Sequence, residues 1–453
     1  MMNNSLKLGL SILLISLVSA CAYNPVKTTP DVALPESFQP EVAATGELTE
    51  EWWQSYQQEE LAGLLQELRN NNRLLKISQY RIDQAQALAR QQSALHLPQV
   101  SFVGNGQKNR NHKSDVTTNV SNLGFEAAYE VDLWGKIDAA SFSADLGVVA
   151  AREENRSTLL RLQTQFVTQY FTHLALTERV RLAELNLTAS EELLALIQIK
   201  LDLGGATETE LNQQRNASLN QQALLIELKR DLKLSGRALA IMLGRDGVFE
   251  LAIKTRMEGV EAPKVAITQP AQLLESRPDI VLAEINLQRQ NAALYQSKKK
   301  RWPSLNISAN SLLNDNSGGP QFWASSLIGG LVQPVFNGGQ IRSEIDFTQA
   351  EVSVAMLNYQ ETVTSAIHEV MENLTVVDHQ RELFQLSEKS LSNSAELYQV
   401  ARLTYDAGTT DFLSLLTAQN SWFTAQDQAV LAKLNYLMST VNLYRSLGTS
   451  PQV

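Results

Sequence analysis

The chain repeats itself, and this repeat constrains its fold more than any other feature. Four short motifs occur twice in the same order, 203 to 205 residues apart. They are 97–100 and 302–305, 133–137 and 336–341, 203–207 and 406–410, and 243–244 and 447–448. Landmarks at a nearly constant separation indicate two copies of one unit of roughly 200 residues. We therefore do not expect the three domains that a length of 453 residues would otherwise suggest.

The N-terminus has the pattern of a lipoprotein signal. After Lys7 comes an apolar run at 8–18, which is too short to span a bilayer but suits a secretory signal. It ends in Val18-Ser19-Ala20-Cys21, which resembles a bacterial lipobox and holds the only cysteine of the chain. We expect residues 1–20 to be removed as a signal peptide and Cys21 to carry a covalent lipid, such as palmitate. An ordinary signal peptide with an incidental cysteine is the alternative. Ala22 resembles the outer-membrane case rather than inner-membrane retention.

The rest of the sequence divides into a tether, two repeats and short connecting segments. Four prolines spaced five residues apart oppose helix formation and predict an extended, lipidated tether at 21–46. The first repeat is predicted at 47–248 and the second at 277–448. Between them lies a connector at 249–276, and a short tail follows at 449–453. In each repeat we expect a helix (59–95 and 277–300), two short strands, a very long helix, a glycine turn and a returning helix.

Apolar and polar residues alternate where the strands are expected. From Leu123 to Leu133 the apolar residues fall at odd positions, and the same alternation returns at 305–310. This period of two predicts strands with one apolar and one polar face, joined by polar loops at 108–118 and 314–321. Each of the four strands is about ten residues long, which suffices to cross an outer membrane at a tilt.

Four strands cannot stand alone in lipid. Open strand edges are not satisfied there, and a closed barrel needs about eight strands. Two chains would supply eight strands with a filled interior, and three chains would supply twelve with room for a channel. A soluble four-stranded sheet packed on helices is the alternative.

The predicted long helices run over 138–202 and 340–406, with no proline inside either. At 1.5 Å per residue each spans roughly 90–100 Å. Apolar residues at 363, 367, 370, 374 and 377 step alternately by four and three, which is typical of a coiled-coil seam. Gly204-Gly205 and Gly408 suit the reversal of the chain. Thr207, and Thr410 or Asp411, stand where the next helix needs an N-cap oxygen. Each repeat should therefore form a long helical hairpin.

These features together resemble the TolC-like outer-membrane efflux proteins, specifically the lipidated branch of resistance-nodulation-division efflux systems. The resemblance covers nearly the whole chain. Its carriers are Trp52-Trp53, Tyr129 to Ile137, Arg277-Pro278-Asp279-Ile280, Pro334 to Ile341 and Arg402 to Gly408. The sequence departs from the family at Asn72-Arg73-Leu74, where an acidic residue more often precedes the leucine. Acid placement after the second turn, at Thr410 and Asp411, also varies among relatives, which leaves the exact gate residue open.

The resemblance implies a homotrimer in the bacterial outer membrane with a mainly α fold and a membrane β portion. Twelve strands from three chains would form one shared barrel, and the helical hairpins would form a periplasmic α-barrel. The tips would narrow to an iris that opens when a periplasmic adaptor protein and an inner-membrane resistance-nodulation-division transporter engage. The implied function is a passive exit duct for small molecules such as drugs and toxic compounds.

Three acidic residues and one basic run have expected roles in such a duct. Glu126, Glu130 and Asp132 share the polar face of one strand, and inward acids would make the lumen negative and favour cations. Alternatively, some of them lie below the membrane and are merely solvated. The run 298–302 contains four basic residues and a tryptophan, and we interpret it as an interfacial anchor rather than a nucleic-acid patch.

The turns at the hairpin tips hold the gate candidates. Asp406 and Asp411 flank the second turn, with Arg402 and Tyr405 before it and Thr410 after it. Acids near a threefold axis repel one another and need a pairing partner, so links between these residues could control opening. Simple capping of helix ends is the alternative. Gly204, Gly205 and Gly408 are expected at the tips, where an adaptor would touch.

Composition excludes other classes of function. A net charge of -10 and a pI of about 5.2 argue against a nucleic-acid partner. A single cysteine forms no internal disulfide or metal cluster, and no catalytic motif is present, so we expect no enzyme activity and no cofactor besides the lipid. Two alternatives stay open: a duct of the same fold for type I protein secretion, and a non-conducting, lipid-anchored coiled-coil scaffold. The sequence does not indicate which substrate is transported.

Overall fold

The computed structural model describes residues 51–448, except 112, 114, 248–250, 252, 266–269 and 317–318, together with Tyr23 and Pro35. The predicted signal peptide, Cys21, most of the tether and the tail at 449–453 lie outside the described residues. The chain forms two compact units, and each unit takes matching segments from both repeats. Of the described residues, the sheet unit contains Tyr23 and those within 80–153 and 281–362, and the hairpin unit contains Pro35 and those within 51–79, 154–280 and 363–448.

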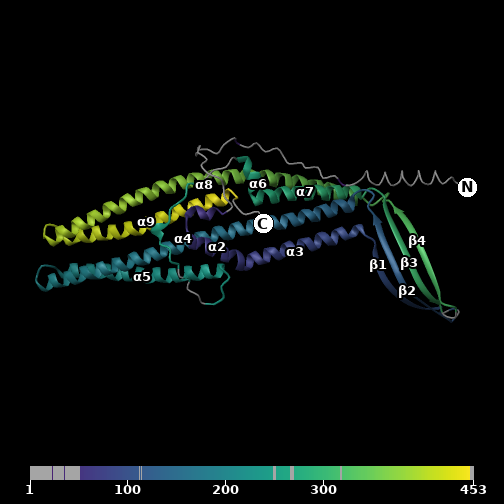
Figure 1. Cartoon of the computed structure of the whole chain (residues 1–453), viewed down its shortest axis with the longest axis horizontal. Coiled ribbons are helices and arrows are strands. Elements are labelled where there is room, and N and C mark those ends of the chain that lie inside the picture. The colour runs from purple at the N-terminus through teal and green to yellow at the C-terminus, as the bar shows by residue number, and fades with distance from the viewer. Residues whose placement is uncertain are drawn as a thin grey trace. The chain divides into compact units, whose positions relative to one another are not determined.

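Helices and strands follow one another in the predicted order (Figure 1). The hairpin unit holds η2 (Trp52–Tyr56), α2 (Glu59–Asn71), α5 (Glu208–Met242), η4 (Met257–Gly259), η5 (Pro270–Gln272), α6 (Leu273–Ser276) and α9 (Phe412–Ser446). The sheet unit holds η3 (Ala94–His96), β1 (Gln99–Asn111), β2 (Val116–Val131), β3 (Ser304–Asn316) and β4 (Phe322–Val332). Four helices have residues in both units: α3 (Arg73–Ser93), α4 (Lys136–Asp202), α7 (Pro278–Lys299) and α8 (Gln340–Asp406).

The duplication is visible in the backbone itself. Helices α4 and α8 each have 67 residues, and α5 and α9 each have 35. Glycines with positive φ pair across the repeats at a separation of 204 residues: 135 with 339, 204 with 408, and 244 with 448. The left-handed glycine at the first tip is therefore Gly204, with φ of 75°, and it corresponds to Gly408, with φ of 72°. Gly205 has no positive φ.

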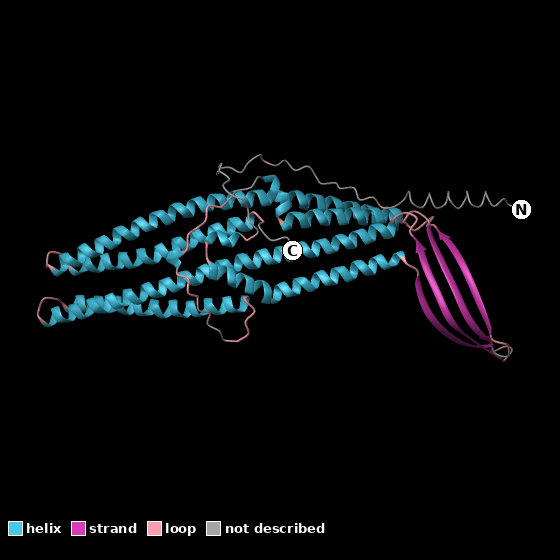
Figure 2. Cartoon of the chain, viewed as in Figure 1, coloured by secondary structure: helices cyan, strands magenta, loops and turns pink. Residues whose placement is uncertain are grey.

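The four strands form one antiparallel sheet in the order β1-β2-β3-β4 (Figure 2). They have 11 to 16 residues each, so they are longer than predicted, and the loops between them are correspondingly shorter. The prediction of a loop at 108–118 was wrong at both ends because Lys108 pairs with Asn119 and Asn111 with Val116. Polar side chains do not end a strand whose backbone groups are paired.

The first predicted helix, 59–95, is in fact two helices. Asn72 has an extended backbone, with ψ of 127°, and separates α2 from α3. Its Oδ1 accepts the backbone N–H groups of Leu74 at 2.9 Å and Leu75 at 3.3 Å, so it caps α3. Its Nδ2 donates to the carbonyl oxygen of Met242 at the end of α5, at 2.8 Å. Asn72 is thus a helix cap, whereas the departure from the family pattern lies at Arg73, which forms an ion pair with Asp246.

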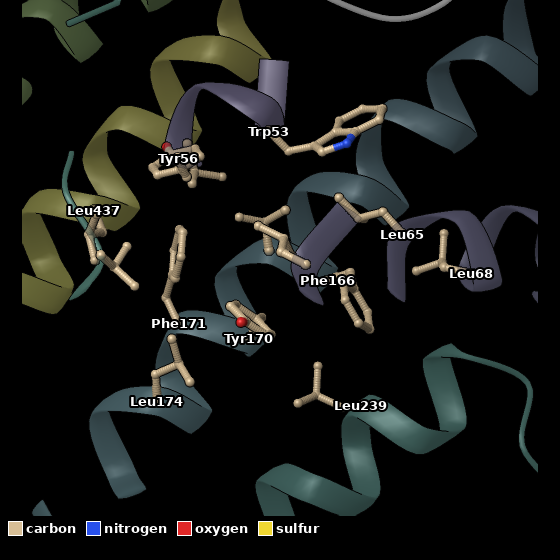
Figure 3. Close-up of a cluster of buried hydrophobic side chains, with 14 of the residues drawn as sticks. Trp53, Tyr56, Leu65, Leu68, Phe166, Tyr170, Phe171, Leu174, Leu239 and Leu437 are labelled. Carbon is tan, nitrogen blue, oxygen red and sulfur yellow. The ribbon is translucent and has the colours of Figure 1, made fainter. Parts of the chain in front are cut away.

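The main core of the hairpin unit lies where η2 and α2 pack against α4, α5 and α9 (Figure 3). Phe166, Tyr170 and Phe171 of α4 are fully buried there. Trp52 stacks on Tyr444 with ring centroids 5.3 Å apart, so the predicted Trp52-Trp53 marker belongs to the core. This cluster joins both helical hairpins at their ends away from the glycine turns.

The Arg277-Pro278-Asp279 motif fastens the start of α7 within the same unit. Arg277 is only 8% exposed, and its guanidinium contacts Asp279 at 2.7 Å and Glu369 of α8 at 2.8 Å. It also donates to the carbonyl oxygen of Ser446 in α9 at 2.7 Å. Pro278 then begins the helix, at the position where proline is best tolerated.

Candidate functional site

Strands β2 and β3 have one apolar and one polar face, as their sequence period predicts. Register places Phe102 opposite Phe125 and Leu313 opposite both Leu123 and Trp323. These apolar side chains are largely exposed, including Phe102 at 63% and Trp323 at 63%. A contiguous exposed apolar face of this kind fits contact with another apolar phase or partner.

On the opposite face the side chains of β1, β2 and β3 are mainly polar, whereas β4 places Phe322, Ile328 and Val332 there. One row consists of Ser101, Glu126, Asn310 and Ser326, which register places side by side. Ser326 donates to the Asn310 side chain at 2.9 Å. Among the described residues, Glu126 makes no ion pair, and it is exposed on this face.

The other two predicted luminal acids have local partners at the junction of β2 and α4. Asp132 accepts the backbone N–H groups of Lys136 at 2.7 Å and Asp138 at 2.8 Å, so it caps the start of α4. Glu130 forms an ion pair with Lys136 at 2.6 Å. Of the three predicted luminal acids, only Glu126 has no ion pair among the described residues, and its luminal role stays a prediction.

Aromatic and basic side chains meet at the same junction. Trp134 and Trp302 pack with ring centroids 4.8 Å apart, and the Trp134 Nε1–H donates to the Pro303 carbonyl at 2.7 Å. Lys299 lies over the rings of Tyr295, at 4.8 Å, and Trp302, at 5.9 Å. The basic run therefore stands beside an aromatic cluster, as an interfacial anchor would require.

The two glycine turns end the helical hairpins, where α4 meets α5 and α8 meets α9 (Figure 1). Thr207 caps α5 in a capping box with Glu210. The cap of α9 is Asp411 rather than Thr410, because the Asp411 carboxylate accepts the Ser414 N–H at 2.7 Å. This hydrogen bond from Ser414 lowers the pKa of Asp411, which is fully exposed to solvent.

A cluster of buried side chains joins the two tips within the hairpin unit. It includes Ile197 of α4, Leu211 of α5, Tyr405 of α8 and Phe412 of α9. Burial raises the pKa of Tyr405, with further contributions from the nearby charges of Glu210 and Asp406. The Lys200 ammonium lies 3.9 Å from the Tyr405 ring centroid and 3.9 Å from the Asp406 carboxylate.

The sequence reasoning missed Lys200. Its counterpart in the second repeat, 204 residues on, is Thr404, so the charge appears in one tip only. A lysine that breaks the repeat four residues before a tip glycine is the signal that could have identified it. Of the predicted gate residues, Tyr405 and Asp406 contact this lysine, whereas Arg402 forms no ion pair within the described part of the chain. Thr410 precedes the cap residue.

No described helix combines the length and apolar character needed to cross a bilayer. Likewise, no group of three or more His, Cys, Asp or Glu side chains in the described part could hold a metal ion.

Comparison with known proteins identifies the family. A family model described as "Outer membrane efflux protein" matches residues 64–245 and 270–449. The chain belongs to this family. The two matched segments overlap the two predicted repeats. The predicted resemblance to the outer-membrane efflux proteins and the outer-membrane location are confirmed, and the assignment to the lipidated branch stays a prediction. The family also confirms the predicted role as an outer-membrane component of an efflux system.

Relatives of this outer membrane efflux protein span its full length. It is 30% identical to the pyoverdine export outer membrane protein OpmQ of Pseudomonas putida, over 97% of each chain. It is 26% identical to the probable efflux pump outer membrane protein TtgC of Pseudomonas putida, over 95% of this chain and 93% of that one. The cation efflux system protein CusC of Escherichia coli is 24% identical over 95% and 96% of the two chains.

Solved structures of outer-membrane channels share the fold. A CusC crystal structure matches with a TM-score of 0.85 and 22% identity, covering 94% of this chain and 100% of the other. The open state of the Neisseria gonorrhoeae MtrE outer membrane channel matches with a TM-score of 0.86 and 21% identity, covering 94% and 98%. The predicted fold of one chain, with long hairpins and a four-stranded sheet, is thereby confirmed.

Proposed function

We propose that three copies of this chain form an outer-membrane exit duct that passively conducts small molecules delivered by an inner-membrane pump. The observation that carries this proposal is the four-stranded sheet. It has an exposed apolar face, a polar face, and outer edges on β1 and β4 that no other described strand covers. In lipid, such edges need partners.

Three chains fit the sheet better than two. Two chains would close eight strands around an interior filled by side chains, whereas three would close twelve strands with space for a channel. In that barrel the row containing Glu126 would face the lumen and the row containing Phe102 would face lipid. Exposed apolar side chains along α8, including Phe347, Leu357 and Leu397, support packing against neighbouring chains.

A lipid on Cys21 would anchor the mature N-terminus. Tyr23, two residues on, packs against Phe142 with ring centroids 5.4 Å apart and against Tyr295 at 4.8 Å. Tyr295 also donates to the Trp134 carbonyl, in the aromatic cluster at the start of α4. An acyl chain two residues from Tyr23 would therefore lie near side chains suited to a membrane interface, which supports lipidation. Labelling with a palmitate analogue should mark the wild type and not Cys21→Ser.

The tips would form the closed end of the duct. Lys200, Tyr405 and Asp406 provide the contact that holds the two tips of one chain, and Arg402 is left to pair with a neighbouring chain. The turns at Gly204, Gly205 and Gly408 would present the surface that a periplasmic adaptor contacts. The inner-membrane partner would be a resistance-nodulation-division transporter, and the protein would have no enzyme activity of its own.

The names of the relatives indicate the class of cargo that this chain conducts. Their names refer to pyoverdine, toluene and cations, which favours small molecules over secreted proteins for this chain as well. A type I protein secretion duct is the second candidate, because the same duct architecture would serve it. Accumulation of an efflux dye in cells lacking the protein, reversed by the plasmid-borne gene, would support the first candidate.

Crosslinking near the tips tests the trimer. Thr409→Cys, next to Gly408 in the second tip, should give dimers and trimers with a short tris-maleimide, whose three arms can each take the single introduced cysteine of one chain, in whole cells. Lys229→Cys, on the same unit but away from the tip, serves as the control for random collision. Monomers alone from Thr409→Cys, or equal crosslinking at both positions, would count against a shared duct.

A further inference from the structure

The coiled-coil seam of the first hairpin is apolar at both ends and polar over a short stretch between them. In α5 the inward positions are 211, 214, 218, 221, 225, 228 and 232, in alternating steps of three and four. Leu225, Leu228 and partly buried Leu232 continue it away from the tip, but positions 214, 218 and 221 are glutamine, serine and glutamine. The polar residues therefore interrupt an otherwise apolar seam.

Polar side chains of α4 and α9 are buried as well. Asn186, Ser190, Gln214, Ser218 and Gln419 are all 8% exposed or less. Along α4 and α5 they fall between two apolar clusters: the tip cluster, which contains Leu193 and Leu211, and a second cluster, which contains Ala183 and Leu225. We refer to these five residues, with Gln221 and Gln426, as the polar band.

The glutamines of the polar band form one pair in each returning helix, and the second pair is one position out of register with the 204-residue repeat. Gln214 and Gln221 are one heptad apart in α5, and Gln419 and Gln426 are one heptad apart in α9, 205 residues later. In the described chain, the Oε1 atoms of all four are buried without a hydrogen-bond partner, as is the Nε2 of Gln419. Gln214 Nε2 alone is well paired, since it donates to the Ser190 carbonyl and hydroxyl oxygens, each at 2.9 Å.

Because these amide oxygens are buried without hydrogen-bond partners, the closed seam is less stable at the polar band than it would be with leucine at the same positions. Such a group loses its hydrogen bonds to water on burial and recovers them only when the seam opens. The adjoining seam toward the core is firmer: Arg179 of α4 forms a two-armed ion pair with Asp427 of α9, at 2.6 and 3.1 Å. In α9 this ion pair directly follows the polar band, because Asp427 is next to Gln426.

We propose that the polar band is the hinge at which the hairpin tips come loose from the rest of the helices. Water that enters the seam hydrogen-bonds to the four glutamine oxygens, so opening costs less here than it would across an apolar seam. The part beyond the band, including the tip cluster and Lys200, opens locally while the main core stays closed. This deepens the proposed function, because it places the moving segment of the duct.

Hydrogen exchange of the full-length protein in detergent or nanodiscs tests the hinge. In the wild type, backbone amides of 193–211 and 398–418 should exchange together, and faster than those of the core segment 159–175. Replacing all four glutamines by leucine should slow exchange at the tip by roughly tenfold or more, because the closed seam no longer buries unpaired amides. Exchange in the core segment should not change.

Exposed glutamines of the same helices give the matched control. Gln213→Leu, Gln222→Leu and Gln428→Leu together add the same kind of side chain on the solvent side of α5 and α9, and tip exchange should stay at the wild-type rate. If the fourfold leucine variant does not fold, the pair Gln214→Met and Gln419→Met makes the same test with side chains of similar length.

Two outcomes would overturn the proposal that the polar band is a hinge. One is tip exchange that is unchanged or faster in a folded band variant, and the other is equal slowing in the control. The test measures local opening and needs no conduction, so a failure of the hinge is distinguishable from a failure of the duct. A duct that conducts with unchanged tip exchange would refute only the hinge.

Discussion

Removing the charge of Lys200 should loosen the closed tips. The Lys200 ammonium lies 3.9 Å from Asp406, and the two side chains are 28% and 46% exposed, so the ion pair is worth up to about 1 kcal/mol. The contact with the Tyr405 ring adds about 0.5–1 kcal/mol. In Lys200→Met each chain would lose about 0.5–2 kcal/mol, and three chains about 1.5–6 kcal/mol. Since 1.4 kcal/mol is tenfold, the closed state would be disfavoured by roughly 10–10⁴-fold.

Uptake of a large hydrophilic dye into cells lacking the partner pump and adaptor measures this opening. Lys200→Met and Asp406→Asn should each increase uptake, and the double variant should do little more than either, because both changes break one contact. Lys229→Met is the control, since Lys229 pairs with Glu184 at 2.7 Å on the same hairpin away from the tip. Uptake by Lys200→Met that matches the wild type or the control would refute the reasoning.

Three further predictions concern stability, measured by thermal or urea unfolding in detergent. Phe166→Ala should cost about 3–5 kcal/mol, because the ring is fully buried in the main core; a loss below 1 kcal/mol would contradict that packing. Gly244→Ala should cost more than about 1 kcal/mol, because φ is 71° and a Cβ would lie 2.6 Å from the Asn71 carbonyl oxygen; a wild-type midpoint would contradict it. Hydrogen bonds from Arg245 lower the pKa of Glu67, so this pair stabilises the fold above the ordinary carboxyl pKa and stops doing so as pH falls through the lowered value. Arg245→Gln should therefore reduce stability at neutral pH and make little difference in acid, and an equal loss at both pH values would contradict it.

The repeat predicted the fold because it fixes where chain reversals occur. Glycines at matching positions recur in a left-handed conformation, and the long proline-free helices between them have equal lengths in both copies. Alternation in β2 likewise predicted which face of the sheet is apolar. These are periodic or backbone signals, which a single sequence displays directly.

Other features depend on contacts that periodicity does not encode. Asn72 ends one helix and begins another because its side chain reaches Met242, which is 170 residues away. Asp132 was grouped with the luminal acids by strand period alone, yet it caps α4. Lys200 contacts the opposite tip only because the two hairpins pack side by side.

The central claim is that the folded protein contains a water-filled path through the outer membrane. Purified full-length protein should be reconstituted in planar bilayers and recorded beside Asp406→Asn, in which the tip contact is broken. The account predicts discrete channel currents, small or rare in the wild type and larger or longer-lived in the variant, with a preference for cations that falls in Glu126→Gln. No channel currents from either protein, although both are folded and inserted, would contradict it.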